Sequence, residues 1–160
     1  MKMSTFTEWI RLVHILSAIW LATGAFAGAV VRAQAKRAGD LAGRVTLLRL
    51  GRRLLTVFSL PGSLLAGLTG LSLLDPMAIG FRHGWVHASL AIWLLILGVT
   101  YLYLAPRQKR LLAAAESSLA AGAPSAELTR LSAAALPGIL ADSTALGVVV
   151  LASLMALKPF

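Results

Sequence analysis

The sequence predicts an all-α protein, a four-span transmembrane helical bundle with up-down-up-down topology and helical cytoplasmic extensions. Of its 160 residues, 58% are hydrophobic and only 13% are charged, whereas soluble domains have about half apolar and about a quarter charged residues. The apolar residues form four long blocks, each close to the roughly 20 residues that a helix needs to cross the hydrocarbon core. One bundle uses the whole length, so we expect a single domain over 1–160.

Each expected span is bounded by charged residues or proline. We expect spans at about 12–31, 54–75, 85–105 and 135–157. Arg32 follows the first, Asp75-Pro76 ends the second, Pro106-Arg107 follows the third, and Lys158 follows the fourth.

The links between spans are also expected to be helical. The Ala- and Leu-rich run 108–119 should extend the third span into the cytoplasm. Gly122-Ala123-Pro124 should break this helix, and Ser125 can cap the next one. The first link places leucines and Val45 among arginines, a pattern typical of an amphipathic segment lying on the inner leaflet.

The basic residues predict the orientation. Seven of them lie between the first and second spans and four between the third and fourth, eleven of the fifteen in the chain. The positive-inside rule therefore places both links in the cytoplasm and both termini outside, in the periplasm of a bacterial inner membrane. The small residues of Ala33-Gln34-Ala35 are also compatible with signal-peptide cleavage. However, the positive charge follows the apolar run instead of preceding it, which favours an uncleaved span.

Composition excludes several function classes. The net charge of +9 could suggest nucleic acid, but the basic residues flank apolar blocks and form no stripe with aromatic residues. Contacts with anionic lipids of the bilayer explain them better. The absence of cysteine excludes disulfides and iron–sulfur clusters. There is no Walker loop, and the carboxylates are too few for a magnesium or calcium site.

Two histidines predict a cofactor site. His14 and His87 lie about one turn inside the outer ends of the first and third spans, which run in the same direction. Ionisable groups within a bilayer are costly and usually functional, and paired neutral imidazoles at one depth can ligate a b-type haem. The first and third helices of such a bundle are diagonal neighbours, a gap that a bis-imidazole iron can span. We expect His14 and His87 to be axial ligands of haem b, which requires the two side chains to converge.

The helical periodicity places His14 on the face of Ser17, Gly24 and Gly28, the last two forming a GxxxG motif for close approach. His87 shares a face with Ala91, Leu94 and Gly98. Both faces are expected to point into the bundle.

Further polar residues lie near the expected site. Arg11 and Arg82, at the same outer level, could pair with haem propionates or an anionic substrate, or could contact lipid headgroups. His83, in the outer loop, could contact headgroups; copper or zinc binding would need His83 and His87 to join His14 on one ion.

Asp142 is the one acid well inside an expected span. A carboxyl group there could belong to a proton relay. Alternatively, it could be held neutral by Ser143, Thr144 or a second-span serine.

Several motifs suggest relatives. The segments Leu12–Trp20, Leu60-Pro61-Gly62 and Ala105–Arg110 resemble an uncharacterised family of four-helix bacterial membrane proteins, domain of unknown function 2269. More distantly, the first-helix histidine and Trp85-Val86-His87 are similar to HemJ-type protoporphyrinogen oxidases and the CopD membrane domain. The HemJ resemblance implies a b haem on His14 and His87. HemJ-like proteins carry a lysine where this chain has Ser89, a departure that argues against oxidase activity but is compatible with haem binding.

The sequence thus predicts a b-type haem-binding membrane protein for electron transfer or porphyrin-linked redox, at most an oxidoreductase of the membrane haem type. Its partners would be quinone or a periplasmic electron carrier. The alternative is a cofactor-free accessory or scaffold subunit whose glycine faces pack against other membrane subunits or a second copy.

Overall fold

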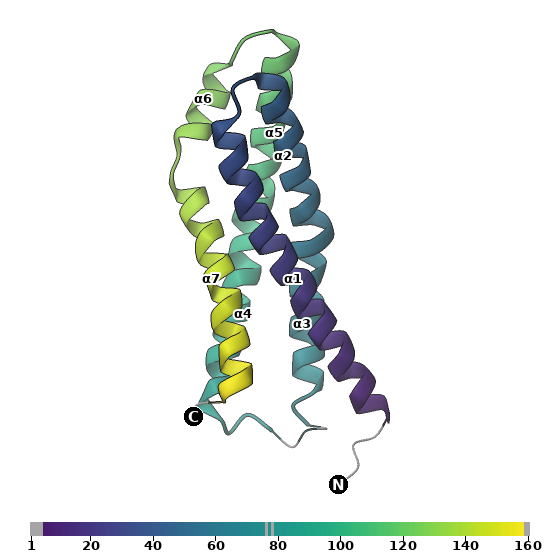
Figure 1. Cartoon of the computed structure of the whole chain (residues 1–160). Coiled ribbons are helices and arrows are strands. Elements are labelled where there is room, and N and C mark those ends of the chain that lie inside the picture. The colour runs from purple at the N-terminus through teal and green to yellow at the C-terminus, as the bar shows by residue number, and fades with distance from the viewer. Residues whose placement is uncertain (1–4, 76, 78, 159–160) are drawn as a thin grey trace.

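A computed structural model describes residues 5–75, 77 and 79–158. Over these residues the chain forms helices and no strand, which confirms the predicted all-α class. The helices run side by side along one long axis (Figure 1). Four of the continuous helices are long and apolar enough to cross a membrane.

Short π-helical segments divide two of the four long helices. The first is α1 (Thr5–Arg37), and the second joins α2 (Leu41–Leu54), η1 (Leu55–Ser59) and α3 (Leu60–Ser72). The third joins α4 (Gly84–Gly98), η2 (Val99–Leu104) and α5 (Ala105–Ala120). A short helix, α6 (Ala126–Ala133), precedes the fourth, α7 (Leu136–Leu157). The second helix ends at Ser72, three residues before the expected end; Pro76 lies outside the described residues.

The bundle has the expected neighbour relations. Helix α1 contacts α3 and α7, and α4 contacts the same two helices. The first and third long helices are therefore diagonal, as predicted. Both ends of the described chain lie at one end of the bundle, which we call the terminal end (Figure 1). The opposite end holds the α1–α2 turn and α6, and we call it the linker end.

Two prolines continue their helices rather than ending them. Pro61 and Pro106 each lie two residues beyond a π-helical segment. Inside a regular α-helix, proline lacks a donor and clashes with the carbonyl four residues back. The wider π turn changes this local hydrogen-bond pattern. Each long helix therefore continues through its proline.

The first link does not lie on a membrane leaflet, so that expectation is wrong. Helix α2 runs back along α1 and packs against α5. The reason is a second apolar core at the linker end, which covers the apolar face of α2 with protein. Its buried members are Ala35, Val45, Leu48, Ala114, Ala115 and Leu128.

Side chains cap two of the linker-end helices. The Asp40 carboxylate accepts a hydrogen bond from Gly43 N at 3.0 Å and caps α2. Ser125 Oγ accepts one from Leu128 N at 3.1 Å, which confirms Ser125 as the cap of α6. Gly122 adopts the left-handed conformation, with φ of 72°, at the predicted break.

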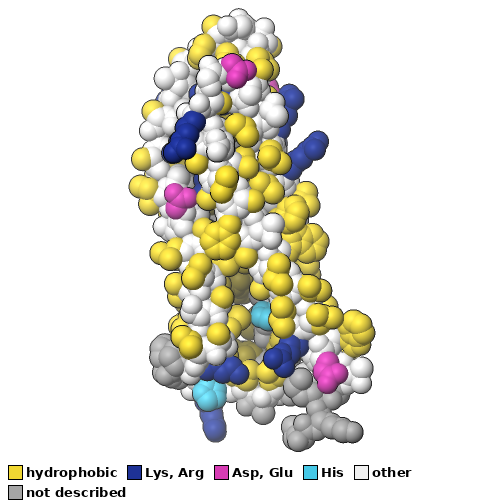
Figure 2. Space-filling model, viewed as in Figure 1, with side chains coloured by type: hydrophobic (Ala, Val, Ile, Leu, Met, Phe, Trp, Pro, Cys, Tyr) yellow, Lys and Arg dark blue, Asp and Glu magenta, His cyan; other side chains and the backbone are white. Residues whose placement is uncertain are grey.

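The outer surface between the two ends is apolar. Leu102 is 82% exposed, Leu95 66% and Leu146 64%. Figure 2 shows Lys and Arg side chains toward both ends and a hydrophobic band between them. A soluble monomer rarely exposes apolar surface on this scale, so these side chains are placed to face lipid.

Candidate functional site

A cavity of about 520 Å³ lies at the terminal end, with walls from α1, α3, α4 and α7. Cofactor and small-molecule sites commonly fall in the range of about 300–1,000 Å³. Figure 2 shows a hollow between α1 and α7 with a histidine side chain inside it. His14 lines this space, which we call the His14 cavity.

The His14 ring is fixed by the second long helix. Its Nδ1 lies 2.9 Å from the Ala66 carbonyl oxygen and 3.2 Å from Thr69 Oγ1. A carbonyl oxygen can only accept, so Nδ1 carries the proton and donates. The Nε2 atom then holds a lone pair and has no hydrogen-bond partner among the described residues. In a largely apolar cavity the neutral imidazole is the favoured form.

Small residues on α3 make room for this ring. A Cβ atom at Gly70 would lie 3.0 Å from His14 Cε1. Ala66, whose carbonyl binds the ring, is itself buried. The inward orientation predicted for His14 is therefore confirmed.

The α4 wall contributes aromatic rings and one free hydroxyl. Ser89 lines the His14 cavity, and its Oγ is buried without a hydrogen-bond partner in the described part of the chain. Trp93 also lines the cavity, and its Nε1 donates to the Ser63 carbonyl at 2.7 Å. Trp85 is 8% exposed and also lines the cavity. Ser89 was not predicted as a site residue, although Trp85, Ser89 and Trp93 recur at the four-residue spacing of one helix face.

Two basic residues line the cavity, and no acidic residue is among its described lining. They are Arg11 on α1 and Lys158 at the end of α7. Lys158 Nζ lies 6.0 Å from the centre of the Trp85 ring. Arg11 was predicted to lie near the site, but Lys158 was missed because it follows the apolar block. Arg82 is exposed and is not part of the lining.

The structure does not bring His87 and His14 together. His87 is exposed, lies outside the cavity lining, and has its Nδ1 3.3 Å from the His83 carbonyl oxygen. Its ring lies 6.4 Å from that of Phe81. The inward face of α4 carries Val86, Ser89 and Ile96 instead. The prediction that His87 points into the bundle is therefore wrong. Helix α4 is apolar on every side, so the periodicity of its sequence does not indicate which face is buried.

The remaining histidine gives no metal cluster. His83 immediately precedes α4, and its exposed ring stacks beside Trp85 at 6.4 Å. Within the described ranges, no group of three His, Asp or Glu side chains could hold a metal ion. The arrangement expected for copper or zinc, with His83 and His87 joining His14, is therefore not formed.

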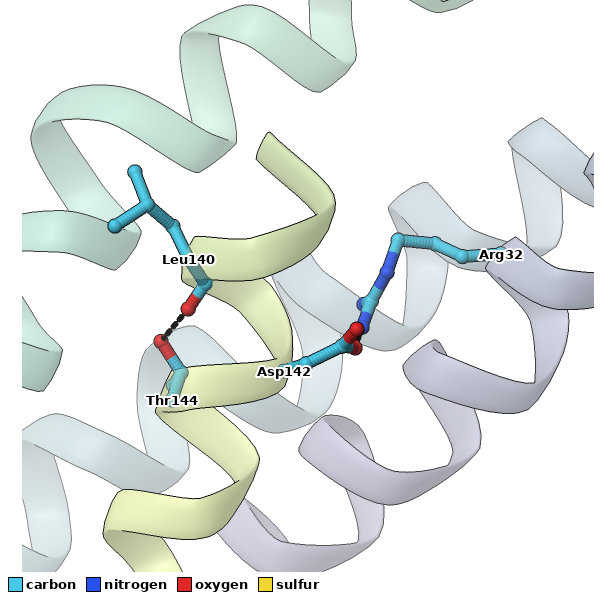
Figure 3. A network of polar contacts seen from close by, with 4 residues as sticks. All are labelled: Arg32, Leu140, Asp142 and Thr144. Atoms are coloured by element: carbon cyan, nitrogen blue, oxygen red, sulfur yellow. Dashed lines mark hydrogen bonds and ion pairs between the residues drawn. The ribbon is translucent and has the colours of Figure 1, made fainter. Parts of the chain in front are cut away.

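Asp142 is not a buried carboxyl group. Its Oδ1 accepts a hydrogen bond from Arg32 Nη2 at 2.6 Å, and its side chain is 68% exposed (Figure 3). Thr144 donates to the Leu140 carbonyl instead, at 2.9 Å. Asp142 also lies outside the His14 cavity lining. The position expected for a relay carboxyl is thus occupied by one half of an ion pair between α1 and α7.

These features define a polytopic integral membrane protein with a ligand-sized cavity between its helices. Residues 8–159 match the family described as "Predicted integral membrane protein (DUF2269)", and the chain belongs to this family. The predicted resemblance to domain of unknown function 2269 is thereby confirmed. No curated protein and no solved structure matches the chain, so similarity to HemJ-type oxidases or CopD is not shown.

Proposed function

We propose that this protein binds haem b in the His14 cavity and serves electron transfer or porphyrin-linked redox. His14 Nε2 would be the protein ligand of the iron, and Arg11 and Lys158 would pair with the propionates. His87, on the outer face of α4, is not part of the proposed site.

One observation carries the proposal: the Nδ1–H of His14 is held by a backbone carbonyl, while Nε2 of this cavity-lining ring has no hydrogen-bond partner among the described residues. A hydrogen bond from the second nitrogen fixes the tautomer and ring orientation of metal-binding histidines. The Ala66 carbonyl, at 2.9 Å, supplies that bond here.

The lining of the cavity matches an amphipathic anion. Its walls are mainly aliphatic and aromatic, and its two basic residues suit carboxylates. Haem b combines a flat apolar ring with two carboxylates, whereas a quinone has none. When bound, haem b would supply one-electron redox chemistry tuned by its axial ligand. Quinone or a periplasmic electron carrier would then be the exchange partner.

The test is haem content. We expect the detergent-purified protein, expressed with ample haem, to give about one haem per chain by pyridine haemochrome assay. His14→Ala should remove most of it, while His87→Ala, a matched change at an exposed histidine, should retain it. Equal loss in both variants would favour the two-histidine site. Colourless wild-type protein would refute haem binding and leave the accessory or scaffold alternative.

A further inference from the structure

A second, smaller cavity lies toward the linker end of the bundle. Its volume is about 160 Å³, and its lining residues come from α1, α2, η1, η2, α5, α6, α7 and the segment between α6 and α7. At about 30 Å³ per water molecule, this volume equals that of roughly five waters. This space suits a phosphate group with a few attached carbon atoms.

Four basic side chains from three helices line this cavity. They are Arg32 and Lys36 of α1, Arg44 of α2 and Arg107 of α5. We call this site the cationic pocket.

The charge of the cationic pocket is largely uncompensated. Among the described residues, Asp142 is the one carboxylate bonded to any of the four, through Arg32. Arg44 donates to Ser132 Oγ at 2.5 Å, and Arg107 to the Leu131 carbonyl at 2.8 Å, both neutral acceptors. These bonds hold the guanidinium groups in place but leave their charges free to act on a ligand.

Lys36 is the least engaged of the four. Within the described part of the chain it makes no hydrogen bond and no ion pair. Its Nζ lies 3.7 Å from the position that a Cβ on Gly138 would take, at the start of α7. Its removal would therefore cost the protein no polar contact of its own.

Membrane topology alone does not explain the convergence. The positive-inside rule requires basic residues near the span ends but does not require them to meet. Arg37, Lys109 and Arg110 lie at the same end and are exposed, as Lys36 is, but they are not part of the lining. These three would satisfy the rule without a pocket.

The membrane side of the cationic pocket is apolar and carries a free hydroxyl. Leu21, Leu55 and Leu104 line that side, together with Thr100. Thr100 is 2% exposed, and its Oγ1 is buried without a partner among the described residues. Threonine in a membrane helix usually bonds the carbonyl four residues back, but Thr100 lies in the π-helical η2. An unpaired buried hydroxyl is costly, and a polar ligand atom would pair it.

We propose that the cationic pocket binds a phosphate group, carried either by an anionic phospholipid or by a soluble phosphate ester. Arginine and lysine form strong charge-assisted bonds with phosphate oxygens. The apolar side and Thr100 would receive the carbon chain and ester oxygens. This site shares only Leu21 with the lining of the His14 cavity, and the proposal does not depend on haem.

The test measures binding to the detergent-solubilised full chain by calorimetry. The probes are inorganic phosphate, glycerol phosphate, and phosphatidylglycerol in mixed micelles, with phosphatidylcholine as the neutral lipid. Lys36→Gln should weaken binding about five- to tenfold, as expected for one charge-assisted contact. Lys109→Gln removes the same charge from a position outside the pocket lining and should leave affinity unchanged. Thr100→Val keeps the side-chain shape and should weaken binding of the esters.

The probes distinguish the two sources. Binding of phosphatidylglycerol alone, dependent on Lys36, would assign a lipid headgroup. Binding of the soluble phosphates with the same dependence would assign a soluble ester. No binding by any anionic probe, or equal weakening by Lys36→Gln and Lys109→Gln, would overturn the pocket in favour of diffuse charge attraction.

Discussion

At the scale of single residues, the hydrogen bond from His14 to Ala66 does more than position a ring. It joins the first long helix to the second and selects which nitrogen can meet a ligand. Ser89 and Thr100 form a contrast, because each has a buried hydroxyl with no partner in the described chain. Each lies in the lining of a different cavity. Unsatisfied buried polar atoms are uncommon in folded proteins and call for an explanation, and a ligand in each cavity would provide one.

The Arg32–Asp142 pair gives a prediction at this scale. If water reaches the Asp142 side chain, which is 68% exposed on the bundle surface, Asp142→Asn should lower the free energy of unfolding by no more than about 1 kcal/mol. It should also leave haem content unchanged. Unfolding in a detergent–denaturant titration, followed by tryptophan fluorescence, would measure the loss. A change of several kcal/mol would mean that the carboxylate is buried in the membrane-embedded protein.

At the scale of elements, glycine on α3 determines how closely α4 approaches. A Cβ at Gly67 would overlap the Trp93 indole, whose Nε1 donates to Ser63. Gly67→Ala should therefore displace this indole and destabilise the fold by about 1–3 kcal/mol, as overpacking does. The same unfolding titration measures it, and the quantum yield of Trp93 should change.

Gly98 provides the matched control on α4. A Cβ there would meet nothing within 4 Å, and alanine is the better helix former by about 1 kcal/mol. Gly98→Ala should be neutral or stabilising. If Gly67→Ala were tolerated as well as Gly98→Ala, Trp93 would not pack closely against α3, which would contradict the structure.

The elements also show how far sequence reasoning reaches. Four long helices, the Ser125 cap and the inward face of α1 follow from apolar length, capping chemistry and the small residues around His14. The buried face of α4 did not, since a helix that is apolar all round gives no directional signal. The packing position of α2 could not be predicted from the sequence either. Amphipathicity shows that Val45 and Leu48 are covered, but not whether lipid or protein covers them.

At the scale of the whole molecule, the described termini share one end, and the remaining prediction is which side of the membrane that end faces. The chain contains no cysteine, so single cysteines can report accessibility without background. Phe81→Cys, in the terminal-end loop, should react with a membrane-impermeant maleimide in intact spheroplasts. Ala123→Cys, at the linker end, should react only after lysis. The reverse pattern would invert the orientation and place the His14 cavity toward the cytoplasm.

The two cavities make the two ends of the bundle chemically different. The His14 cavity, with an imidazole and two basic residues, lies at the terminal end, and the cationic pocket lies toward the linker end. Under the predicted orientation, the first faces the periplasmic leaflet and the second the cytoplasmic one. A redox group near one face and a phosphate group near the other would then bind independently.

The measurement that tests the central claim most directly is the absorption spectrum of the dithionite-reduced protein before and after carbon monoxide. Because His14 is the one protein ligand proposed for the iron, carbon monoxide would be able to bind the haem and should shift the Soret band at once. The His87→Ala protein should give the same shift. Absence of any Soret band, or a low-spin spectrum that carbon monoxide does not change, would contradict a haem held by His14 alone.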